Sequence, residues 1–304
     1  MIKLSNTDLT IYPLCLGGNV FGYSADKESS EAVLNFYAEN GGNFIDTADM
    51  YSQWAPGHIG GESETIIGNW MKKRGNRSQM VIATKVGKLD TKPGLKASNI
   101  ISACEDSLKR LGSDYIDIYY SHQDDLDTPI EQTLGAYDSL IKSGKVRYIA
   151  ASNFTHERLQ ESLDISKELN LASYIASQDQ YNLMEREYES TLRDTLEKNN
   201  LSQIPFYGLA RGFLTGKYRP GASVKSVRAT GVSNAYGNER GWRMLEKLDQ
   251  IAKERNTSIA SISLAWLRAQ RTVAAPIASA TKLEQIKEIM PIVELNKEEL
   301  ALLS

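Results

Sequence analysis

Val81-Ile82-Ala83-Thr84-Lys85 opens a strand–helix–strand unit that continues through SNIISACEDSLKRL at residues 98–111 and ends with IDIYYS at residues 116–121. The two outer runs are short and rich in β-branched and aromatic residues, which favour strands. The middle segment has the length and the apolar spacing of an amphipathic helix, and Gly112 follows it, where a left-handed residue commonly ends a helix. Such a unit predicts two parallel strands joined by a helix that covers the sheet.

The same alternation extends over the whole chain. Further strand candidates lie at residues 14–17, 44–46, 146–152, 174–178, 203–206 and 273–278, and further helix candidates lie at residues 30–40, 62–74, 129–143, 155–169, 188–199 and 258–269. Continuous alternation predicts parallel strands, and eight of them favour closure into a (β/α)8 TIM barrel over an open doubly wound sheet. No linker rich in proline, glycine or serine divides the sequence, so we expect one domain over residues 1–304.

Two segments stand outside this alternation. Residues 4–11 place the turn-forming Asn6 and Asp8 between short apolar flanks, which predicts a small β-hairpin that closes the bottom of the barrel. Residues 219–241 form one long irregular stretch. Because a loop of that length inside a compact domain is usually functional, we expect a mobile flap that covers a bound cofactor.

The composition points to a globular protein that acts on small molecules. The chain is 41% hydrophobic and 24% charged with a formal net charge of -3, and its basic residues are spread out, which disfavours nucleic acid and anionic membranes as partners. The two cysteines, Cys15 and Cys104, are too few for a disulfide framework, and the first residues carry no apolar signal core. No apolar run is long enough to span a bilayer. We therefore expect a cytoplasmic protein that is not embedded in a membrane.

Three of the predicted strands end in an ionisable residue: Asp46, Lys85 and His122. Active sites of TIM barrels lie at the C-terminal ends of the strands, so these side chains are expected to share one cavity. Tyr51 follows Asp46 by five residues, close enough for the same loop to fold its ring over that cavity. A nearby ammonium favours the phenolate form of a tyrosine, and a neutral imidazole can orient a substrate oxygen. The four residues predict a site for reduction of a carbonyl group.

Each of these residues also has an ordinary structural explanation. An aspartate such as Asp46 at a strand end can cap the next helix, and Lys85 can face the solvent. His122 can satisfy a polar group of the core. Position alone does not decide between these explanations and a catalytic role.

Other kinds of site have less support in the sequence. The three histidines, His58, His122 and His156, are too scattered for a metal site, so we predict no metal. Residues 17–22 are only a loose relative of the Gly-x-Gly-x-x-Gly pattern of dinucleotide-binding folds. No Gly-x-Ser-x-Gly elbow indicates a hydrolase.

Many separated stretches, in order along nearly the whole chain, resemble the aldo-keto reductase family. They are GGN at 17–19, NFIDTADMY at 43–51, GGESE at 60–64, ATK at 83–85, DIYYSH at 117–122, GKVRYI at 144–149, ASNF at 151–154, QYNL at 180–183 and LARGFLTGKY at 209–218. The resemblance implies a catalytic tetrad of Asp46, Tyr51, Lys85 and His122. Tyr51 is then the general acid, Lys85 paired with Asp46 lowers the pKa of the phenol, and His122 holds the carbonyl oxygen.

The resemblance also implies a site for a nicotinamide cofactor. Ser152, Asn153 and Gln178 correspond to residues that bind the carboxamide, and Phe206 falls where the family usually has the tyrosine that stacks on the nicotinamide. Lys217 corresponds to the lysine of the pyrophosphate loop, with a solvated loop lysine as the alternative. The complete set of expected cofactor-binding residues is Gly18, Asn19, Ser152, Asn153, Gln178, Phe206, Leu209, Arg211, Gly212, Lys217, Ser279, Thr281, Lys282 and Gln285.

The choice between NADPH and NADH depends on the stretch after the eighth strand. Thr281 falls where the family often has an arginine that pairs with the adenosine 2′-phosphate, and Ile289 falls where it has an asparagine. Ser279 and Thr281 can still donate neutral hydrogen bonds, Gln285 can reach the adenosine, and Lys282 can supply charge. We expect NADPH to be preferred and NADH to work measurably.

The expected substrate is a small aldehyde, a ketone or a sugar-derived carbonyl compound, reduced reversibly to an alcohol. Trp54 and His58, in the loop after Tyr51, are the candidates for the substrate-binding wall. A different function is that of a redox-sensing regulatory subunit, because the potassium-channel beta subunits belong to the same family and retain bound cofactor. Nothing in the sequence indicates the oligomeric state.

Overall fold

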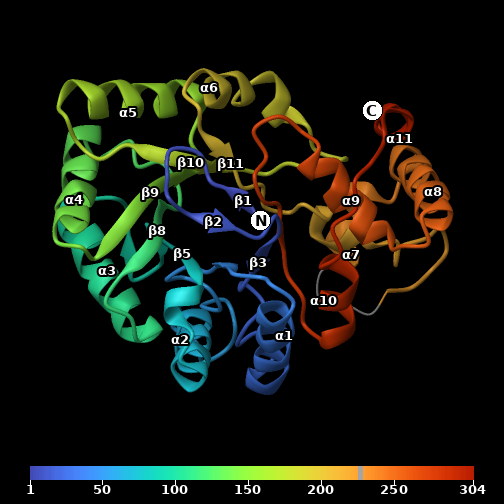
Figure 1. The fold of residues 1–304 in the computed structure, drawn as a ribbon, viewed down its shortest axis with the longest axis horizontal. Helices are drawn as coiled ribbons and strands as arrows, with labels where there is room; N and C mark the ends of the chain where they lie inside the picture. Colours follow the sequence, from blue (N-terminus) through green and yellow to red (C-terminus); the bar gives the residue numbers. More distant parts are fainter. Residues whose placement is uncertain (225–228) are drawn as a thin grey trace.

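The computed structural model describes residues 1–224 and 229–304, and a closed parallel β-barrel forms its centre (Figure 1). The strands follow the order β11-β10-β9-β8-β5-β4-β3-β12. They are β3 (Cys15–Gly17), β4 (Phe44–Asp46), β5 (Val81–Val86), β8 (Ile116–Ser121), β9 (Val146–Ser152), β10 (Tyr174–Gln178), β11 (Ser202–Gln203) and β12 (Ile277–Ala278). All seven neighbouring pairs are parallel, as the strand–helix alternation predicted.

Backbone hydrogen bonds join the two ends of this sheet and close it. Gln203 pairs with Val273 in parallel, and the Ala274 amide donates to the Gln203 carbonyl over 2.9 Å. The Ile277 amide, at the first residue of β12, donates to the Pro205 carbonyl over 2.9 Å. The expected (β/α)8 barrel is confirmed. Its last two strands are shorter than the predicted runs 203–206 and 273–278, because regular pairing there is reduced to a few bonds.

Helices cover the outside of the barrel between successive strands (Figure 1). They are α1 (Lys27–Glu39), α2 (Glu62–Arg74), α3 (Ala97–Leu111), α4 (Ile130–Lys142), α5 (His156–Glu168), α6 (Arg193–Lys198), α9 (Ile259–Arg268) and α10 (Leu283–Ile289). Helix α1 begins after Asp26, whose carboxylate accepts a hydrogen bond from the Ser29 amide. Helix α3 ends at Gly112 with a φ of 58°, the left-handed residue predicted there.

The hairpin predicted at the start of the chain is present and plugs the barrel. Strands β1 (Ile2–Lys3) and β2 (Thr10–Ile11) pair antiparallel. Leu4, Leu9 and Ile11 are buried in one cluster with the inward-facing side chains of the strands. This cluster fills the interior from the end opposite the strand C-termini, so polar chemistry is confined to the other end.

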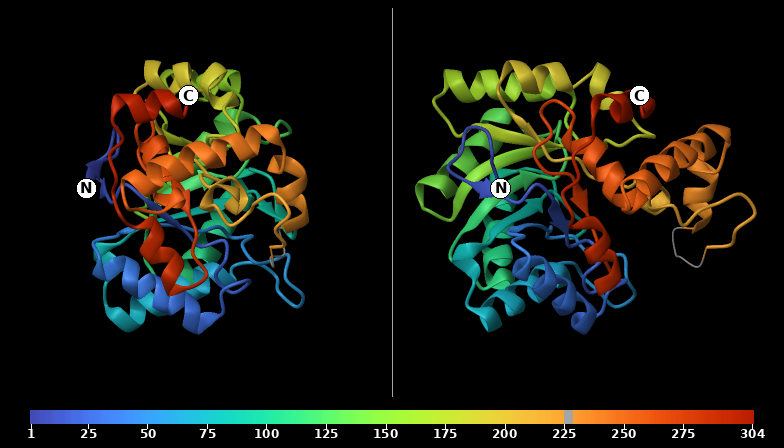
Figure 2. Two further views of the ribbon diagram at one scale, coloured as in Figure 1. Left: turned by 90° about the vertical axis from the view of Figure 1, so that its right-hand side faces the viewer. Right: turned by 45° about the vertical axis from the view of Figure 1, so that its right-hand side comes forward.

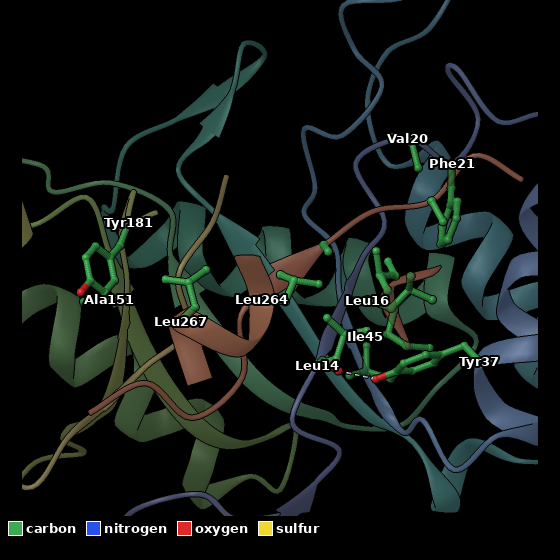
Figure 3. Close-up of a cluster of buried hydrophobic side chains, with 14 of the residues drawn as sticks. Leu14, Leu16, Val20, Phe21, Tyr37, Ile45, Ala151, Tyr181, Leu264 and Leu267 are labelled. Atoms are coloured by element: carbon green, nitrogen blue, oxygen red, sulfur yellow. Dashed lines mark hydrogen bonds between the residues drawn. The ribbon is translucent and has the colours of Figure 1, made fainter. Parts of the chain in front are cut away.

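A second hydrophobic cluster lies between the strands and the helices. Figure 3 shows part of it, where the Tyr37 ring from α1 packs beside Leu14, Leu16 and Ile45. The Tyr37 hydroxyl donates a hydrogen bond of 2.6 Å to the Leu14 carbonyl. A buried tyrosine hydroxyl needs a hydrogen-bond partner, and the Leu14 carbonyl supplies it. The Tyr37 ring can therefore pack α1 against the barrel without leaving its hydroxyl unpaired.

The structure corrects the interpretation of residues 219–241 as one irregular loop. Helix α7 (Ala229–Tyr236) lies within that range, and helix α8 (Glu239–Glu254) begins there because the Asn238 side chain accepts from the Gly241 amide. Residues 225–228 of the expected flap lie outside the described residues. Figure 2 shows that α8 protrudes from one side of the barrel. The cofactor-covering role of this segment stays a prediction.

Three further differences concern short elements. The predicted helix 188–199 is a 3-10 turn (Glu187–Ser190) and the six-residue α6, separated at Thr191, whose φ of -123° and ψ of -72° are not helical. A second hairpin, β6 (Lys88–Leu89) with β7 (Lys92–Pro93), follows β5. Helix α11 (Lys297–Leu302) ends the fold. The hairpin β6–β7 and the helices α7, α8, α10 and α11 were not predicted.

Candidate active site

The Lys85 ammonium is the centre of a buried cluster at the C-terminal ends of β4 and β5. It donates hydrogen bonds to both oxygens of Asp46, over 2.6 and 2.7 Å, and to the Thr47 carbonyl over 2.7 Å. Both charged residues are almost completely buried. A buried ammonium is tolerated only when it is paired and hydrogen-bonded in this way, so the alternative of a solvent-facing lysine is excluded.

Tyr51 returns to this cluster from the loop after β4. The Lys85 ammonium donates to its hydroxyl over 3.0 Å, and the hydroxyl donates to Asp46 over 3.1 Å. The loop is anchored to β5, because the Thr47 amide donates to the Ala83 carbonyl and the Asp49 amide donates to the Lys85 carbonyl. The loop therefore folds the Tyr51 side chain back onto Asp46 and Lys85, as the spacing of five residues between Asp46 and Tyr51 predicted.

His122 follows β8 and faces the same end of the barrel. Its ring centroid lies 6.0 Å from that of Tyr51, edge to face. Burial, and then the positive charges of Lys85 and Lys88, lower the pKa of His122 well below 6.5. The imidazole is therefore neutral at pH 7, with one nitrogen able to donate a hydrogen bond.

The pKa of Tyr51 differs from the expectation. Burial is the main cause that raises it well above 10, and the Asp46 carboxylate adds to the rise. The lowering expected from Lys85 is outweighed, because burial and the Asp46 carboxylate both favour the protonated phenol. Tyr51 consequently keeps its proton at neutral pH, while Lys85 stands in place to stabilise the oxygen if the proton leaves.

Three of the expected cofactor residues form a hydrogen-bonded chain beside the tetrad. The Asn153 side chain donates to Ser152 Oγ over 2.9 Å and to the His122 carbonyl over 2.9 Å. Ser152 Oγ donates to the Gln178 carbonyl over 2.8 Å. The Gln178 amide in turn donates to Asp46 over 3.0 Å. These amide and hydroxyl groups fit the donor and acceptor pattern of a carboxamide.

The segment after β11 has an unusual backbone. Tyr207, Ala210, Arg211 and Gly212 all have positive φ values, of 53°, 46°, 56° and 98°. Non-glycine residues in this region cost free energy and gather at functional sites. The Lys217 ammonium lies against this backbone, 3.3 Å from the position that a Cβ on Gly212 would take. A loop of this shape with an ammonium beside it fits a phosphate-binding role.

Phe206 lies before this loop, at the open end of the barrel interior. It packs against the inner hydrophobic cluster, and its ring is 5.1 Å from that of Tyr207. The Phe206 amide donates to the Asp179 carbonyl over 3.1 Å, which fixes the ring's backbone beside β10. Leu209 is partly buried against the outer cluster.

The residues expected at the adenosine end also lie together. Ser279 Oγ donates to the Asn19 side chain over 2.6 Å, so the loops after β3 and β12 are joined. A Cβ on Gly18 would lie 2.7 Å from Ser63 Oγ, so only glycine allows this close approach. The Gln285 side-chain oxygen accepts from the Thr281 amide and hydroxyl, over 2.8 and 3.1 Å.

Lys282 is the last member of the expected adenosine set. It is exposed at the start of α10, with no side-chain capping bond. A contact with the cofactor would require the Lys282 side chain to turn inward, and its role stays a prediction.

Comparison with known proteins identifies the family of this chain. The sequence model of the Aldo/keto reductase family matches residues 13–304. The chain belongs to the aldo/keto reductase family. An uncharacterized oxidoreductase of Bacillus subtilis, YrpG, is 31% identical over 99% of this chain and 94% of that protein. The L-glyceraldehyde 3-phosphate reductase of Escherichia coli is 32% identical over 88% of this chain and 80% of that enzyme. A probable voltage-gated potassium channel subunit beta of Oryza sativa subsp. japonica is 30% identical over 96% and 90%.

This aldo/keto reductase carries aromatic side chains beside Tyr51. The Trp54 ring lies 6.1 Å from that of Tyr51, and Tyr23, which was not predicted, lies 5.9 Å from Trp54. Both outer rings are partly exposed. His58 lies in the same loop as Trp54, and its Nδ1 is buried with no hydrogen-bond partner among residues 1–224 and 229–304. Trp54 thus lies beside Tyr51, and His58 lies seven residues beyond Tyr51. The substrate-binding role of both residues stays a prediction.

Two buried acids behind the tetrad of the aldo/keto reductase were missed by the sequence analysis. Glu64 accepts from Thr84 over 2.6 Å and from Arg110 over 2.6 Å. Asp49 is completely buried, and neither carboxylate oxygen has a partner in the described part of the chain. Burial first, and then Glu64, raise the pKa of Asp49 to about 8. The signal was present in the NFIDTADMY stretch, where Asp49 stands three residues after Asp46.

A third missed acid lies on the cofactor side of the same site. An Asp179 carboxylate oxygen accepts from the Asn153 amide over 3.2 Å, where Asn153 has a φ of 58°. Ser177 Oγ donates to the other oxygen over 2.5 Å. Burial raises the pKa of Asp179 to about 6 against these hydrogen bonds. Asp179 therefore holds the backbone of a residue that is expected to contact the nicotinamide.

A separate cavity of about 660 Å³ lies between α5 and α6, lined by residues such as His156, Glu161 and Lys198. It is open to the solvent on the outside of the barrel and contains none of the tetrad residues. In the described residues, no group of three His, Cys, Asp or Glu side chains is placed to hold a metal ion. Within residues 1–224 and 229–304, no helix has the length and apolar character needed to cross a membrane.

Proposed function

We propose that this protein reduces the carbonyl group of an aldehyde or a ketone with NAD(P)H, and that the reaction is reversible. The observation that carries the proposal is the contact of the Tyr51 hydroxyl with both Lys85 and Asp46, over 3.0 and 3.1 Å, at the open end of the barrel. A protonated phenol beside a buried ammonium is suited to give a proton to an oxygen that gains negative charge.

Each member of the tetrad has its own part in this proposal. Bound NAD(P)H supplies the hydride that the carbonyl carbon accepts. The Tyr51 hydroxyl gives its proton to the carbonyl oxygen, and Lys85 stabilises the tyrosine oxygen as the proton leaves. The neutral His122 donates a hydrogen bond to the same substrate oxygen and fixes its orientation. Asp46 keeps Lys85 in place and balances its charge.

The residues that would hold the cofactor lie around the other half of the barrel rim. Ser152, Asn153 and Gln178 would bind the carboxamide, and Phe206 would stack on the nicotinamide. The loop with Leu209, Arg211, Gly212 and Lys217 would meet the pyrophosphate. Gly18, Asn19, Ser279, Thr281, Lys282 and Gln285 would border the adenosine end. NADPH is the proposed first choice. NADH is also expected to work measurably, because position 281 is a threonine and not the arginine that would pair with the 2′-phosphate of NADPH.

The substrate is proposed to be a small carbonyl compound, and the protein is proposed to act in the cytoplasm. Trp54 and His58 border its entrance. The relative named L-glyceraldehyde 3-phosphate reductase acts on a small sugar-derived aldehyde, which supports a substrate of similar size.

The test is a screen of aldehydes and ketones with NADPH and with NADH, in which cofactor oxidation and alcohol formation are both measured. Repeated turnover that disappears in the Tyr51→Phe variant is the expected result. Absence of turnover for every carbonyl compound and both cofactors would contradict the proposed function.

A regulatory subunit is the second candidate, favoured by the 30% identity with a probable potassium channel subunit beta. The same screen separates the two functions. A regulatory subunit would bind the cofactor with measurable affinity but would oxidise at most one equivalent of it, whereas an enzyme turns over many times.

A further inference from the structure

The hairpin β6–β7 forms part of the rim around the candidate active site. It follows β5 directly, so Lys88 stands three residues after Lys85. The Gln53 side chain of the Tyr51 loop donates to the Lys88 carbonyl over 3.5 Å and accepts from the Asp90 amide over 3.2 Å. The hairpin and the Tyr51 loop are therefore held together as one wall of the site.

Alternation along β6 decides where the Lys88 side chain points. Leu89 packs against the Tyr51 loop, because its Cδ1 lies 2.6 Å from the position that a Cβ on Gly60 would take. Successive side chains of a strand point to opposite faces, so Lys88 points away from that loop. The lowered pKa of His122, to which the Lys88 charge contributes, agrees with an ammonium directed towards the neighbouring strand end.

The Lys88 ammonium has no partner in the protein as far as it is described. Over residues 1–224 and 229–304, no carboxylate lies within ion-pair distance of it, and no acceptor forms a hydrogen bond with it. Lys88 is nevertheless partly buried, and burial and the Lys85 charge both lower its pKa. Lys92 on β7 of the same hairpin differs in this respect, since its ammonium pairs with Asp106 over 2.5 Å.

From this geometry we infer that Lys88 binds an anionic group of the substrate, so that the preferred substrates are carbonyl compounds with a carboxylate or a phosphate. This inference rests on the proposed function and names the substrate class for the same site. A partly buried ammonium close to the positive charge of Lys85 is costly, and an anion that binds there would compensate it. His122 and Tyr51 would meanwhile hold the carbonyl oxygen of the same molecule.

The position of Lys88 separates this anion from the phosphates of the cofactor. The residues expected to hold the cofactor follow β9, β10, β11 and β12, with a short stretch after β3. Lys88 follows β5, on the part of the rim that also carries the loop with Tyr51 and Trp54. A negative group that reaches Lys88 therefore belongs to the substrate.

The experiment compares matched pairs of substrates that differ in one charge. Succinic semialdehyde against butanal tests a carboxylate, and glyceraldehyde 3-phosphate against glyceraldehyde tests a phosphate. For each pair, the ratio of kcat/KM values, anionic over neutral, is measured in the wild-type protein and in Lys88→Met, Lys88→Arg and the control Lys92→Met. The ratio of KM values is also followed against salt concentration, because ion pairing at a partly open site weakens as salt rises.

For at least one pair, the wild-type ratio is expected to exceed one and to fall about ten- to 200-fold in Lys88→Met, the range for a charge-assisted hydrogen bond. Lys88→Arg is expected to keep most of the preference, and Lys92→Met is expected to leave it unchanged. The pair that responds identifies the anionic group. Ratios that stay the same in Lys88→Met while neutral aldehydes turn over would overturn this inference alone. If no carbonyl compound is reduced, the proposed function is wrong and this inference falls with it.

Discussion

The Gln178 side-chain amide donates a hydrogen bond of 3.0 Å to the Asp46 carboxylate, across the open end of the barrel. Asp46 belongs to the expected tetrad, and Gln178 is expected to contact the nicotinamide, so one hydrogen bond joins the part of the site proposed for proton transfer to the part proposed to hold the cofactor. A change in the position of either residue is transmitted to the other, because both side chains are buried and closely surrounded.

This contact predicts that Gln178→Leu impairs both functions of the site. The variant loses a hydrogen bond to a charged group and the expected contact with the carboxamide, so cofactor dissociation constants should rise by about ten-fold or more and kcat should fall as well. Fluorescence titration with the cofactor and steady-state kinetics measure the two effects. An unchanged cofactor affinity would show that Gln178 has no part in binding.

Removal of the Tyr51 hydroxyl is expected to abolish proton donation while the ring volume is kept. In Tyr51→Phe, kcat for an unactivated aldehyde should fall by at least about 10²-fold, and cofactor affinity should barely change. Stopped-flow measurement of a single turnover separates the chemical step from product release. A variant with near-normal turnover would end the assignment of Tyr51 as the general acid.

Lys85→Met should affect both activity and stability, because it leaves the Asp46 carboxylate buried without its partner. The free energy of unfolding is expected to fall by about 3–5 kcal/mol, and the double variant with Asp46→Asn should recover part of that loss. Since Lys85 favours the phenolate, residual alcohol oxidation in Lys85→Met should shift to more alkaline pH. Normal activity with an unchanged pH profile would show that Lys85 is only structural.

Asp49 predicts a specific dependence of stability on pH. Its pKa is about 8 in the folded protein against an ordinary value of 3.8, so the folded state favours the protonated form. The stability associated with this group is complete below about pH 4 and is lost as the pH rises through about 8. Chemical denaturation of the wild-type protein, of Asp49→Asn and of the exposed control Asp114→Asn across this range measures the effect. Asp49→Asn should flatten the decline and the control should not, and equal slopes in all three would contradict the prediction.

Coenzyme preference is expected to depend on position 281. The wild-type protein should prefer NADPH over NADH by less than about 10³-fold in kcat/KM, because the loop lacks an arginine there. Thr281→Arg should raise the preference by about ten- to 200-fold, whereas Thr281→Gln, which adds bulk without charge, should not. A wild-type preference above 10³-fold would reveal another group that binds the 2′-phosphate.

The barrel and the tetrad could be predicted because both depend on short-range patterns. Asp46, Lys85 and His122 stand at the ends of clear strands, and parallel strands bring their ends together whatever the loops contain. Lys88 could not be placed in the same way, because a strand of two residues is too short to be recognised from the sequence. The partner of a charged side chain is also a property of the folded chain: the sequence gives no sign that Lys92 is paired and that Lys88 is not.

The protruding part of the fold was harder to predict for a related reason. Helix α8 buries Leu245, Leu248 and Ile251 at helical spacing, but charged residues fill most of its other positions, and a stretch of turn-forming residues precedes it. The net shift of the Tyr51 pKa could not be predicted from the sequence, because it depends on burial and on Asp46 as well as on Lys85. Such a balance is visible only when the positions of all three groups are known.

The pairing of β3 with β12 has a consequence for how the protein folds during its synthesis. Ser279 and Asn19, which join the loops after these strands, are separated by 260 residues along the chain. The N-terminus of the chain leaves the ribosome first, so β3 is made long before β12, the strand with which it pairs. Until then one edge of the nascent sheet is open to the wrong partners. A dinucleotide that contacts both Asn19 and Ser279 would bind only the folded barrel and would therefore stabilise it. The concentration of cofactor in the cell would then influence what fraction of the newly made chain reaches the folded state.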